Sequence, residues 1–225
     1  MAHKIPIDWQ SIQTVFLDMD GTLLDLHFDN HFWLEHLPKR YAEKHNMPYA
    51  KARDILMQHS DATQGTLDWY CLDHWSETFK IDIVSLKHEV SNKITIRENV
   101  ISFLHQLKVM KKRIVLLTNA HIDSVTLKFS YVEMEHYFDE IITSHDIGLA
   151  KEQKGFWEAL TKYENFDRTQ CLFIDDNCDV LANADEFGIK HLFSITKPDS
   201  NKSAKKCKNH IAIADFQQLM INLND

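Results

Sequence analysis

Short apolar runs that end at polar residues are the feature that most constrains how this chain of 225 residues folds. Such runs cover residues 14–17, 113–118, 138–144, 171–174 and 190–194. Their length and their β-branched and aromatic content predict buried strands. From residue 97 onward, amphipathic segments of helical period separate the runs, at residues 100–108, 122–132, 153–164 and 178–187. This alternation predicts an α/β fold, a doubly wound, Rossmann-like parallel sheet with helices on both faces.

Residues 26–94 interrupt the alternation because they contain no convincing strand. Their aromatic residues recur at helical spacing, and the segment is too long for a simple connection between two strands. The sequence therefore predicts an α-helical cap domain at residues 26–94, inserted into a catalytic core made of residues 1–25 and 95–225. A short helix at residues 212–222 is expected to end the chain.

The composition excludes several classes of protein. Asp and Glu number 33 and Lys and Arg 25, a net charge of −8, so we expect no binding to polymeric nucleic acid. The five glycines stand where neither GxGxxG nor GxxxxGK(S/T) can be built. No apolar run reaches the ~20 residues of a membrane span, and no signal-peptide core follows Met1. We therefore expect a cytoplasmic protein with no membrane partner.

The four cysteines are Cys71, Cys171, Cys178 and Cys207. Their spacing matches no zinc-binding or redox motif, so we expect all four to be reduced and structural. The 14 histidines are scattered, and most are expected at surface or packed positions. Nothing in the sequence indicates an oligomeric state.

Polar side chains follow three of the predicted strands at the point where each strand ends. Asp18 and Asp20 follow the first strand, Asn119 the second, and Asp175 and Asp176 the fourth. Ligands of open parallel sheets bind at the carboxyl ends of the strands, so we expect these side chains to converge. Burying several carboxylates needs a compensating cation, and oxygen ligands of this kind suit Mg²⁺. The alternative for the DxDG segment is an ordinary turn.

Hydroxyl, amide and amine groups near the same strand ends have the chemistry to hold a phosphate. Thr118 and Asn119 end the second strand, and Lys151 follows the third. Each has a structural alternative, since Thr118 and Asn119 are also typical helix caps and Lys151 also fits a solvated surface position. Lys154 is a competing candidate for the cationic role.

These residues form four motifs that resemble those of the haloacid dehalogenase superfamily. In chain order the motifs are DMDGTLLD at 18–25, LTN at 117–119, Lys151, and FIDD at 173–176. An insert directly after the first motif is similar to the helical cap of superfamily phosphatases. Two features depart from the common pattern: Lys151 is followed by Glu152 where Pro is frequent, and Arg97-Glu98-Asn99 stands where Pro-Gly is frequent.

The resemblance is closer still to one subgroup, the bacterial GMP/IMP 5′-nucleotidases. It includes the segments FDN at 28–30, LDWYCLD at 67–73, WSE at 75–77 and TNAH at 118–121. It implies a phosphomonoesterase whose substrate is a small phosphorylated metabolite, a purine nucleoside monophosphate such as GMP or IMP. Phosphoglycolate or a sugar phosphate is the alternative substrate within the same superfamily.

The resemblance implies a mechanism through an aspartyl-phosphate. Asp18 would attack phosphorus, and Asp20 would protonate the leaving oxygen and then activate water. Asp20 also argues against dehalogenation, which has no leaving alkoxide to protonate. The implied cofactor is Mg²⁺, with Mn²⁺ as an alternative. Its ligands would be Asp18, the carbonyl of Asp20, and Asp176, with Asp175 a ligand through water or a partner behind the ligands.

Lys151, with Thr118 and Asn119, would hold the phosphoryl oxygens on which charge accumulates.

Aromatic residues of the predicted cap are candidates for substrate selection. Four aromatic residues have the shape to stack on a purine: Trp33, Trp69, Tyr70 and Trp75. Asn30 and Asp73 have groups that could read base edges. The alternative is that aromatic residues at helical spacing pack against one another.

Two other classes of protein are also considered. A phospho-accepting, receiver-like binding module uses an acidic pair, a hydroxyl residue and a lysine on such a sheet, but it places the acidic pair first and has no helical insert. A scaffold without catalysis is disfavoured because every expected catalytic side chain is present.

Overall fold

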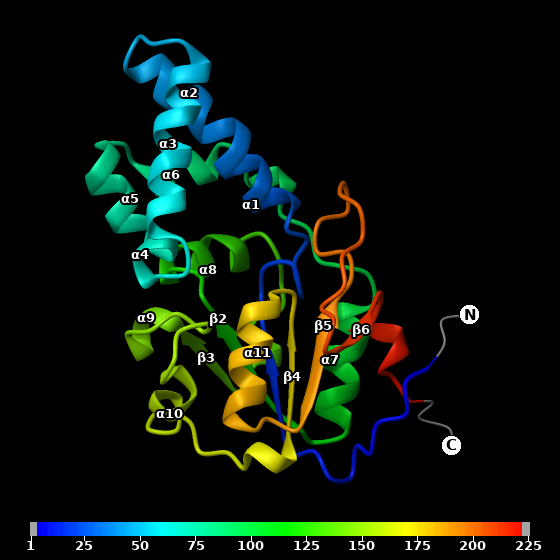
Figure 1. Ribbon diagram of the computed structural model, residues 1–225. Helices are drawn as coiled ribbons and strands as arrows, with labels where there is room; N and C mark the ends of the chain where they lie inside the picture. The colour runs from blue at the N-terminus through cyan, green and yellow to red at the C-terminus, as the bar shows by residue number, and fades with distance from the viewer. Residues whose placement is uncertain (1–3, 222–225) are drawn as a thin grey trace.

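Six parallel strands form the centre of the protein, for which a computed structural model describes residues 4–221. The strands are β1 (Thr14–Leu17), β2 (Arg113–Thr118), β3 (Glu140–Thr143), β4 (Cys171–Asp175), β5 (His191–Ile195) and β6 (Ile211–Ile213). They pair in the order β3-β2-β1-β4-β5-β6, every pair parallel (Figure 1). The predicted doubly wound α/β sheet is confirmed. The ends of the predicted core range, residues 1–3 and 222–225, lie outside the described residues.

Helices separate the first five strands in the predicted order. The α-helices are α1 (His27–His31), α2 (Leu37–Lys44), α3 (Tyr49–Thr63), α4 (Leu67–Tyr70), α5 (Leu72–Phe79), α6 (Ile83–His88), α7 (Val100–Val109), α8 (Ile122–Phe129), α9 (Ser144–Ile147), α10 (Phe156–Leu160) and α11 (Cys178–Phe187). A π-helix (Phe32–His36) joins α1 to α2, and short 3₁₀ turns cover Ser91–Lys93, Glu135–Tyr137, Arg168–Gln170 and Phe216–Gln218.

Alternate side chains of the central strands are buried on opposite faces of the sheet, as the two-residue period of a strand requires. In β1, Val15 and Leu17 join the core that contains Phe103 of α7. Phe16 lies in the opposite core, against Trp157 of α10 at 5.9 Å between ring centroids. Both faces are therefore covered, which explains why the strands read as continuous apolar runs.

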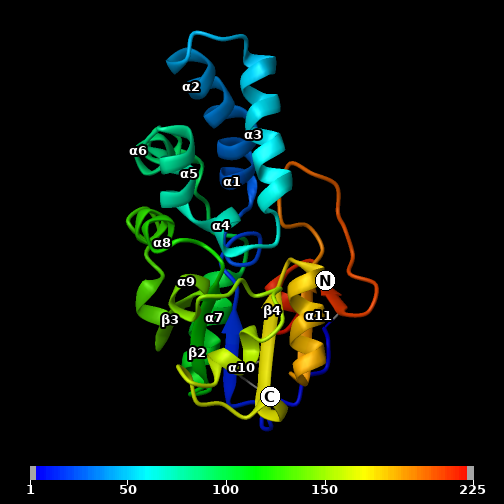
Figure 2. The ribbon, with the colours of Figure 1, turned by 60° about the vertical axis from the view of Figure 1, so that its left-hand side comes forward.

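Helices α1–α6 stand beyond the carboxyl ends of the strands in both views (Figures 1 and 2). Within residues 26–94 the structure contains helices and turns but no strand. The two connections to the sheet run side by side, because Asp25 N donates to Thr95 O at 2.9 Å and Arg97 N donates to Leu23 O at 3.0 Å. The helical insert thus leaves and re-enters the sheet region at one place.

Three predictions are wrong in detail. The end of the chain forms β6 and a 3₁₀ turn over residues 211–218 rather than a helix at 212–222, of which residue 222 lies outside the described residues. The helix predicted at 153–164 is the shorter α10. The cysteines are not all reduced, because Cys178 and Cys207 form a disulfide, whereas Cys71 and Cys171 are free. This pairing depends on the loop before β6 folding back onto α11, which Cys spacing does not reveal.

No helix in residues 4–221 is long and apolar enough to cross a membrane.

Candidate active site

Three carboxylates from two adjacent strands meet at the carboxyl edge of the sheet. Asp18 follows β1, Asp175 ends β4, and Asp176 comes next in the chain; one oxygen of each lies within 4.8 Å of the others. Leu17 of β1 pairs with Ile174 of β4, and this register brings the acids together from distant parts of the sequence.

A buried lysine joins two of these acids. Lys151 is 2% exposed, and its Nζ donates to Asp18 Oδ1 at 2.7 Å, to Asp175 Oδ2 at 2.6 Å and to Leu117 O at 3.0 Å. Burial alone would lower the pKa of Lys151, but Asp175 and Asp18 raise it above its ordinary value. The ammonium group is therefore charged and held in place. Lys154, the competing candidate, is exposed and does not line the same cavity.

The end of β2 is tied to this lysine. Asn119 Oδ1 accepts from the backbone N–H of Lys151 at 2.9 Å, and Asn119 Nδ2 donates to Glu152 Oε2 at 2.8 Å. Thr118 Oγ1 accepts from Ala120 N at 3.0 Å. Neither Thr118 nor Asn119 caps the next helix, because the N-cap of α8 is His121.

The acids have the chemistry of a divalent cation site. Asp18 Oδ2 is buried and has no hydrogen-bond partner among the described residues. Burial raises the pKa values of Asp18, Asp175 and Asp176 to about 6 each, so the nearby lysines compensate their negative charges only in part. Oxygen donors arranged in this way fit a hard cation. A metal ion could therefore be held by this cluster.

Gly21 allows the turn after β1 to approach the acids. Its φ is +86°, a conformation that favours glycine. A Cβ there would lie 2.8 Å from Cγ of Asp176 and 2.9 Å from Cβ of Pro198. The glycine is thus required for the position of the Asp176 carboxylate.

Asp20 belongs to a buried chain of charges that the sequence did not indicate. Lys128 Nζ lies 2.6 Å from Asp20 Oδ1 and donates to Asp29 Oδ2 at 2.7 Å. Lys87 Nζ donates to Asp29 Oδ1 at 2.7 Å. Both lysines are 1% exposed. One signal was present, since Lys128 stands three residues after Val125, on the helix face that the apolar period places inside.

Asp20 and Asp29, the two acids in this series of charges, have pKa values shifted in opposite directions. Burial raises the pKa of Asp20 to about 6, although Lys128 opposes the shift. Burial acts in the same direction on Asp29, but Lys128 and Lys87 together lower the pKa of Asp29 below its ordinary value. Asp29 is therefore the permanently ionised partner of Lys128, whereas Asp20 exchanges its proton near neutral pH.

The candidate site residues predicted from the sequence, except Asp73 and Lys154, line one cavity of about 580 Å³ between the helical insert and the sheet. They are Asp18, Asp20, Asn30, Trp33, Trp69, Tyr70, Trp75, Thr118, Asn119, Lys151, Asp175 and Asp176. Asp73 is not among the lining residues, and its side chain is 72% exposed. The volume lies within the range of small-molecule sites. Three cationic residues that were not predicted at this site also line the cavity: Arg53, Lys87 and Lys205.

The aromatic residues of the cavity also pack within the protein. The ring of Trp33 lies 4.7 Å from that of Trp75, and Trp69 Nε1 donates to Ser60 Oγ at 2.9 Å. Tyr70 OH donates to Glu152 Oε1 at 2.7 Å. These residues therefore combine the two roles that the sequence left as alternatives, packing and lining the cavity.

Asn30 has a partner outside the insert. Its Nδ2 donates to Asp199 Oδ2 at 2.7 Å, which fixes the amide at the edge of the cavity.

The carboxylates that follow the first and fourth strands, and the buried lysine that they share, have the chemistry of a hydrolase active site. Residues 12–188 match the haloacid dehalogenase-like hydrolases, and the chain belongs to that family of enzymes.

Among curated proteins, the chain is 36% identical to the GMP/IMP nucleotidase YrfG of Escherichia coli (strain K12) over 219 residues, which cover 97% of this chain and 99% of that protein. It is 24% identical to (S)-2-haloacid dehalogenase 2 of Pseudomonas sp. (strain CBS-3) over 190 residues, 80% of this chain and 82% of that protein.

Solved structures share the fold. A HAD phosphatase from Thermococcus onnurineus superimposes with a TM-score of 0.76 at 18% identity, covering 92% of this chain and 95% of that chain. A predicted phosphoglycolate phosphatase from Haemophilus somnus 129PT gives a TM-score of 0.67 at 18% identity, with 92% and 95% covered.

Proposed function

We propose that this hydrolase cleaves the phosphate ester of a purine nucleoside 5′-monophosphate, GMP or IMP, to give the nucleoside and phosphate. One observation carries the proposal: Asp18 lines the cavity, Lys151 holds one of its carboxylate oxygens, and the other oxygen is buried and unpartnered among the described residues. A carboxylate held in this way is suited to attack. The 36% identity to a GMP/IMP nucleotidase supports the choice of substrate.

Mg²⁺ is the proposed metal, with Mn²⁺ as the alternative. The proposed ligands are a carboxylate oxygen of Asp18, the backbone carbonyl of Asp20, and Asp176. Asp175 would bind the ion through a water molecule or support the ligands without touching the ion. When bound, the ion offsets the repulsion between an anionic carboxylate and an anionic phosphate.

The reaction takes two steps on this proposal. An oxygen of Asp18 bonds to phosphorus as the bond to the nucleoside oxygen breaks, and Asp20 gives its proton to that leaving oxygen. Water then bonds to phosphorus as the bond to Asp18 breaks, and Asp20 takes the proton from that water. The raised pKa of Asp20, about 6, suits both proton transfers.

The remaining candidate residues would hold the phosphoryl group. Lys151 supplies a fixed positive charge, and Thr118 and Asn119 supply a hydroxyl and an amide beside it. Such groups act most strongly where water is excluded.

Residues 26–94 would act as a cap domain over a core of residues 1–25 and 95–225. Trp33, Trp69 and Tyr70 line the cavity on the insert side, and flat aromatic rings suit a purine. Asn30, already oriented by Asp199, is the candidate for contact with the base or ribose.

The test is a set of assays in the presence of Mg²⁺ that measure the phosphate released from GMP, IMP, phosphoglycolate and a sugar phosphate. We expect the highest kcat/KM with GMP or IMP. Activity on phosphoglycolate without activity on either nucleotide would remove the nucleotidase assignment and favour the alternative substrate.

Asp18→Asn tests the nucleophile in the same assays. We expect loss of turnover with unchanged folding, measured by circular dichroism, because an amide cannot form the acyl phosphate. Retained activity would exclude Asp18 as the nucleophile. A long-lived phosphoprotein without turnover in the unaltered enzyme would instead indicate a receiver-like module.

A further inference from the structure

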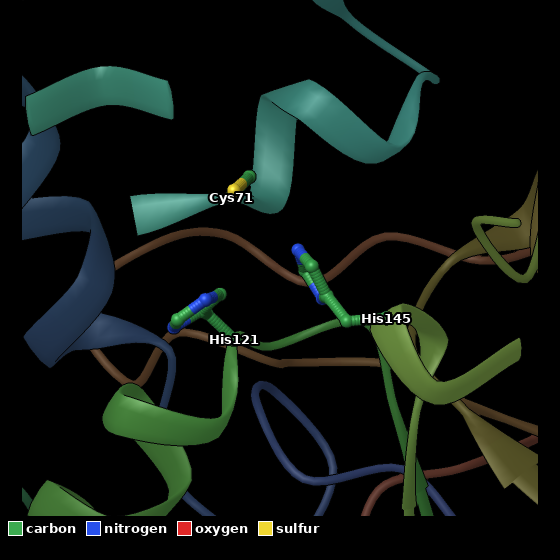
Figure 3. Close-up of side chains that lie close together, drawn as sticks. All are labelled: Cys71, His121 and His145. Carbon is green, nitrogen blue, oxygen red and sulfur yellow. The ribbon is translucent and has the colours of Figure 1, made fainter. Parts of the chain in front are cut away.

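A second group of metal-binding side chains lies outside the acidic cluster. Cys71 joins α4 to α5 in the helical insert, His121 is the N-cap of α8, and His145 belongs to α9. One ligand atom of each lies within 4.8 Å of the other two. Figure 3 shows the three side chains gathered from these three elements.

The polar atoms of this group have few or weak partners: His121 Nδ1 accepts one long hydrogen bond, from Asp123 N at 3.4 Å, and lies 3.5 Å from the carboxylate of Asp123. Both ring nitrogens of His145 are buried and have no hydrogen-bond partner within residues 4–221. The His121 ring lies edge-on to it, with 4.9 Å between centroids. Cys71 is not in a disulfide, and its Sγ accepts one long hydrogen bond, from His74 N at 3.5 Å. Buried polar atoms without partners are rare in proteins, and a bound ion would satisfy them.

We infer that Cys71, His121 and His145 form a binding site for a borderline transition-metal ion such as Zn²⁺. One thiolate and two imidazoles are ligands that such ions prefer. Zinc–sulfur and zinc–nitrogen bonds of about 2.3 and 2.0 Å place tetrahedral ligand atoms roughly 3–4 Å apart, so shifts of about 1 Å complete the site. The exposed carboxylate of Asp73, 3.8 Å from His121 Nε2, is available for the fourth position.

This site differs from the acidic cluster in both chemistry and consequence. Sulfur and nitrogen donors bind Mg²⁺ poorly, whereas the carboxylates favour it. Cys71 lies in the insert and both histidines lie in the sheet region, so a bound ion would tie the two together. Cys71 directly follows Tyr70, and His121 itself lines the cavity. Zn²⁺ bound here therefore slows opening of the cavity and turnover, although the binding itself does not depend on the proposed function.

The experiment is a titration of the full-length protein with Co²⁺, a spectroscopic substitute for Zn²⁺, at saturating Mg²⁺ and without thiol reductant. The Mg²⁺ is added to fill the acidic cluster, which is its proposed site, and the Cys178–Cys207 disulfide removes two thiols. We expect one equivalent of Co²⁺ to produce a thiolate-to-cobalt charge-transfer band, which Zn²⁺ abolishes by displacement.

Two variants and one matched control locate the site. Cys71→Ser should abolish the band, and His145→Asn should weaken Co²⁺ binding by more than about tenfold. Cys171→Ala is the control, since burial raises the pKa of the Cys171 thiol to about 12, and it should leave the band intact. No band in the unaltered protein, or a band that survives in Cys71→Ser, would overturn the inference. Circular dichroism checks that each variant folds.

Discussion

Lys128 shows how one residue can serve both folding and chemistry. Its ammonium group is shared by Asp20, which follows β1, and Asp29, which lies in the helical insert. Burying a charge costs several kcal/mol unless it is paired. Each charge in the series Lys87–Asp29–Lys128–Asp20 has a partner of opposite sign. Because Asp29 remains ionised, it can neutralise Lys128 while Asp20 changes its protonation state.

Lys128→Met tests this residue. Removing the shared cation leaves Asp20 without its partner and leaves Asp29 with Lys87 alone, so we expect the free energy of unfolding to fall by about 3–5 kcal/mol. We also expect kcat to fall by about tenfold or more, since Asp20 is no longer held in position. Urea unfolding and kcat on GMP are the two measurements. The matched control is Lys108→Met, which removes a partly exposed ion pair with Asp139. This change should lower the free energy of unfolding by less than about 1 kcal/mol. Equal effects of the two changes would contradict the role of Lys128.

At the scale of elements, Glu152 links the insert to the sheet. One oxygen accepts from Tyr70 at the end of α4, and the other accepts from Asn119 after β2. Burial and Glu152 raise the pKa of Tyr70 well above its ordinary value, so the phenol stays a donor. The Glu at this position, a departure from the common Lys-Pro pair, thus has a structural reason: it connects α4 to the residues that position Lys151.

Tyr70→Phe removes this link with little change in shape. Glu152 loses a donor in a partly buried position, at a cost of about 1–3 kcal/mol. We expect kcat/KM to fall by about tenfold, mainly through KM, because closure of the insert is weakened. Steady-state kinetics check this, with Tyr163→Phe, at a 59% exposed tyrosine, as the control. A variant with unaltered KM would show that the hydrogen bond does not couple α4 to the site.

For the whole molecule, the acidic cluster makes stability depend on pH and on metal. The folded-state pKa values of Asp18, Asp175 and Asp176 are raised to about 6, above the ~4 of an unfolded chain. The folded protein therefore binds more protons than the unfolded chain between about pH 4 and 6. Ionisation of these three acids lowers the free energy of unfolding as pH rises through that window. A cation bound among the ionised acids would restore it.

Mg²⁺ should therefore raise Tm more at pH 7.5 than at pH 5. With Mg²⁺ at about 100 times its Kd, stabilisation of about 2.7 kcal/mol corresponds to a shift of roughly 5–10 °C for a chain of this size. Thermal unfolding at both pH values, with and without EDTA, measures the effect. Asp176→Asn should abolish most of the shift; a shift that is independent of pH, or that persists in this variant, would place the ion elsewhere.

Local pattern was enough to predict the sheet and the residues at its edge. Apolar runs form strands, parallel strands end at one edge, and so Asp18, Asp175 and Asp176 had to lie near one another whatever the details of the loops. The same reasoning missed β6, because the three residues Ile211–Ile213 carry too little periodicity and become a strand through pairing with β5.

Contacts across the insert were decided by the three-dimensional packing alone. Whether Lys128 meets Asp29, Tyr70 meets Glu152, or Cys178 meets Cys207 depends on how the helices after β1 and the loop before β6 settle on the sheet. No short-range periodicity encodes those placements, since they result from burial summed over many distant residues. Chain order and the succession of apolar runs and amphipathic segments thus account for where the acids gather, whereas long-range packing determines which charges, hydroxyls and thiols surround them.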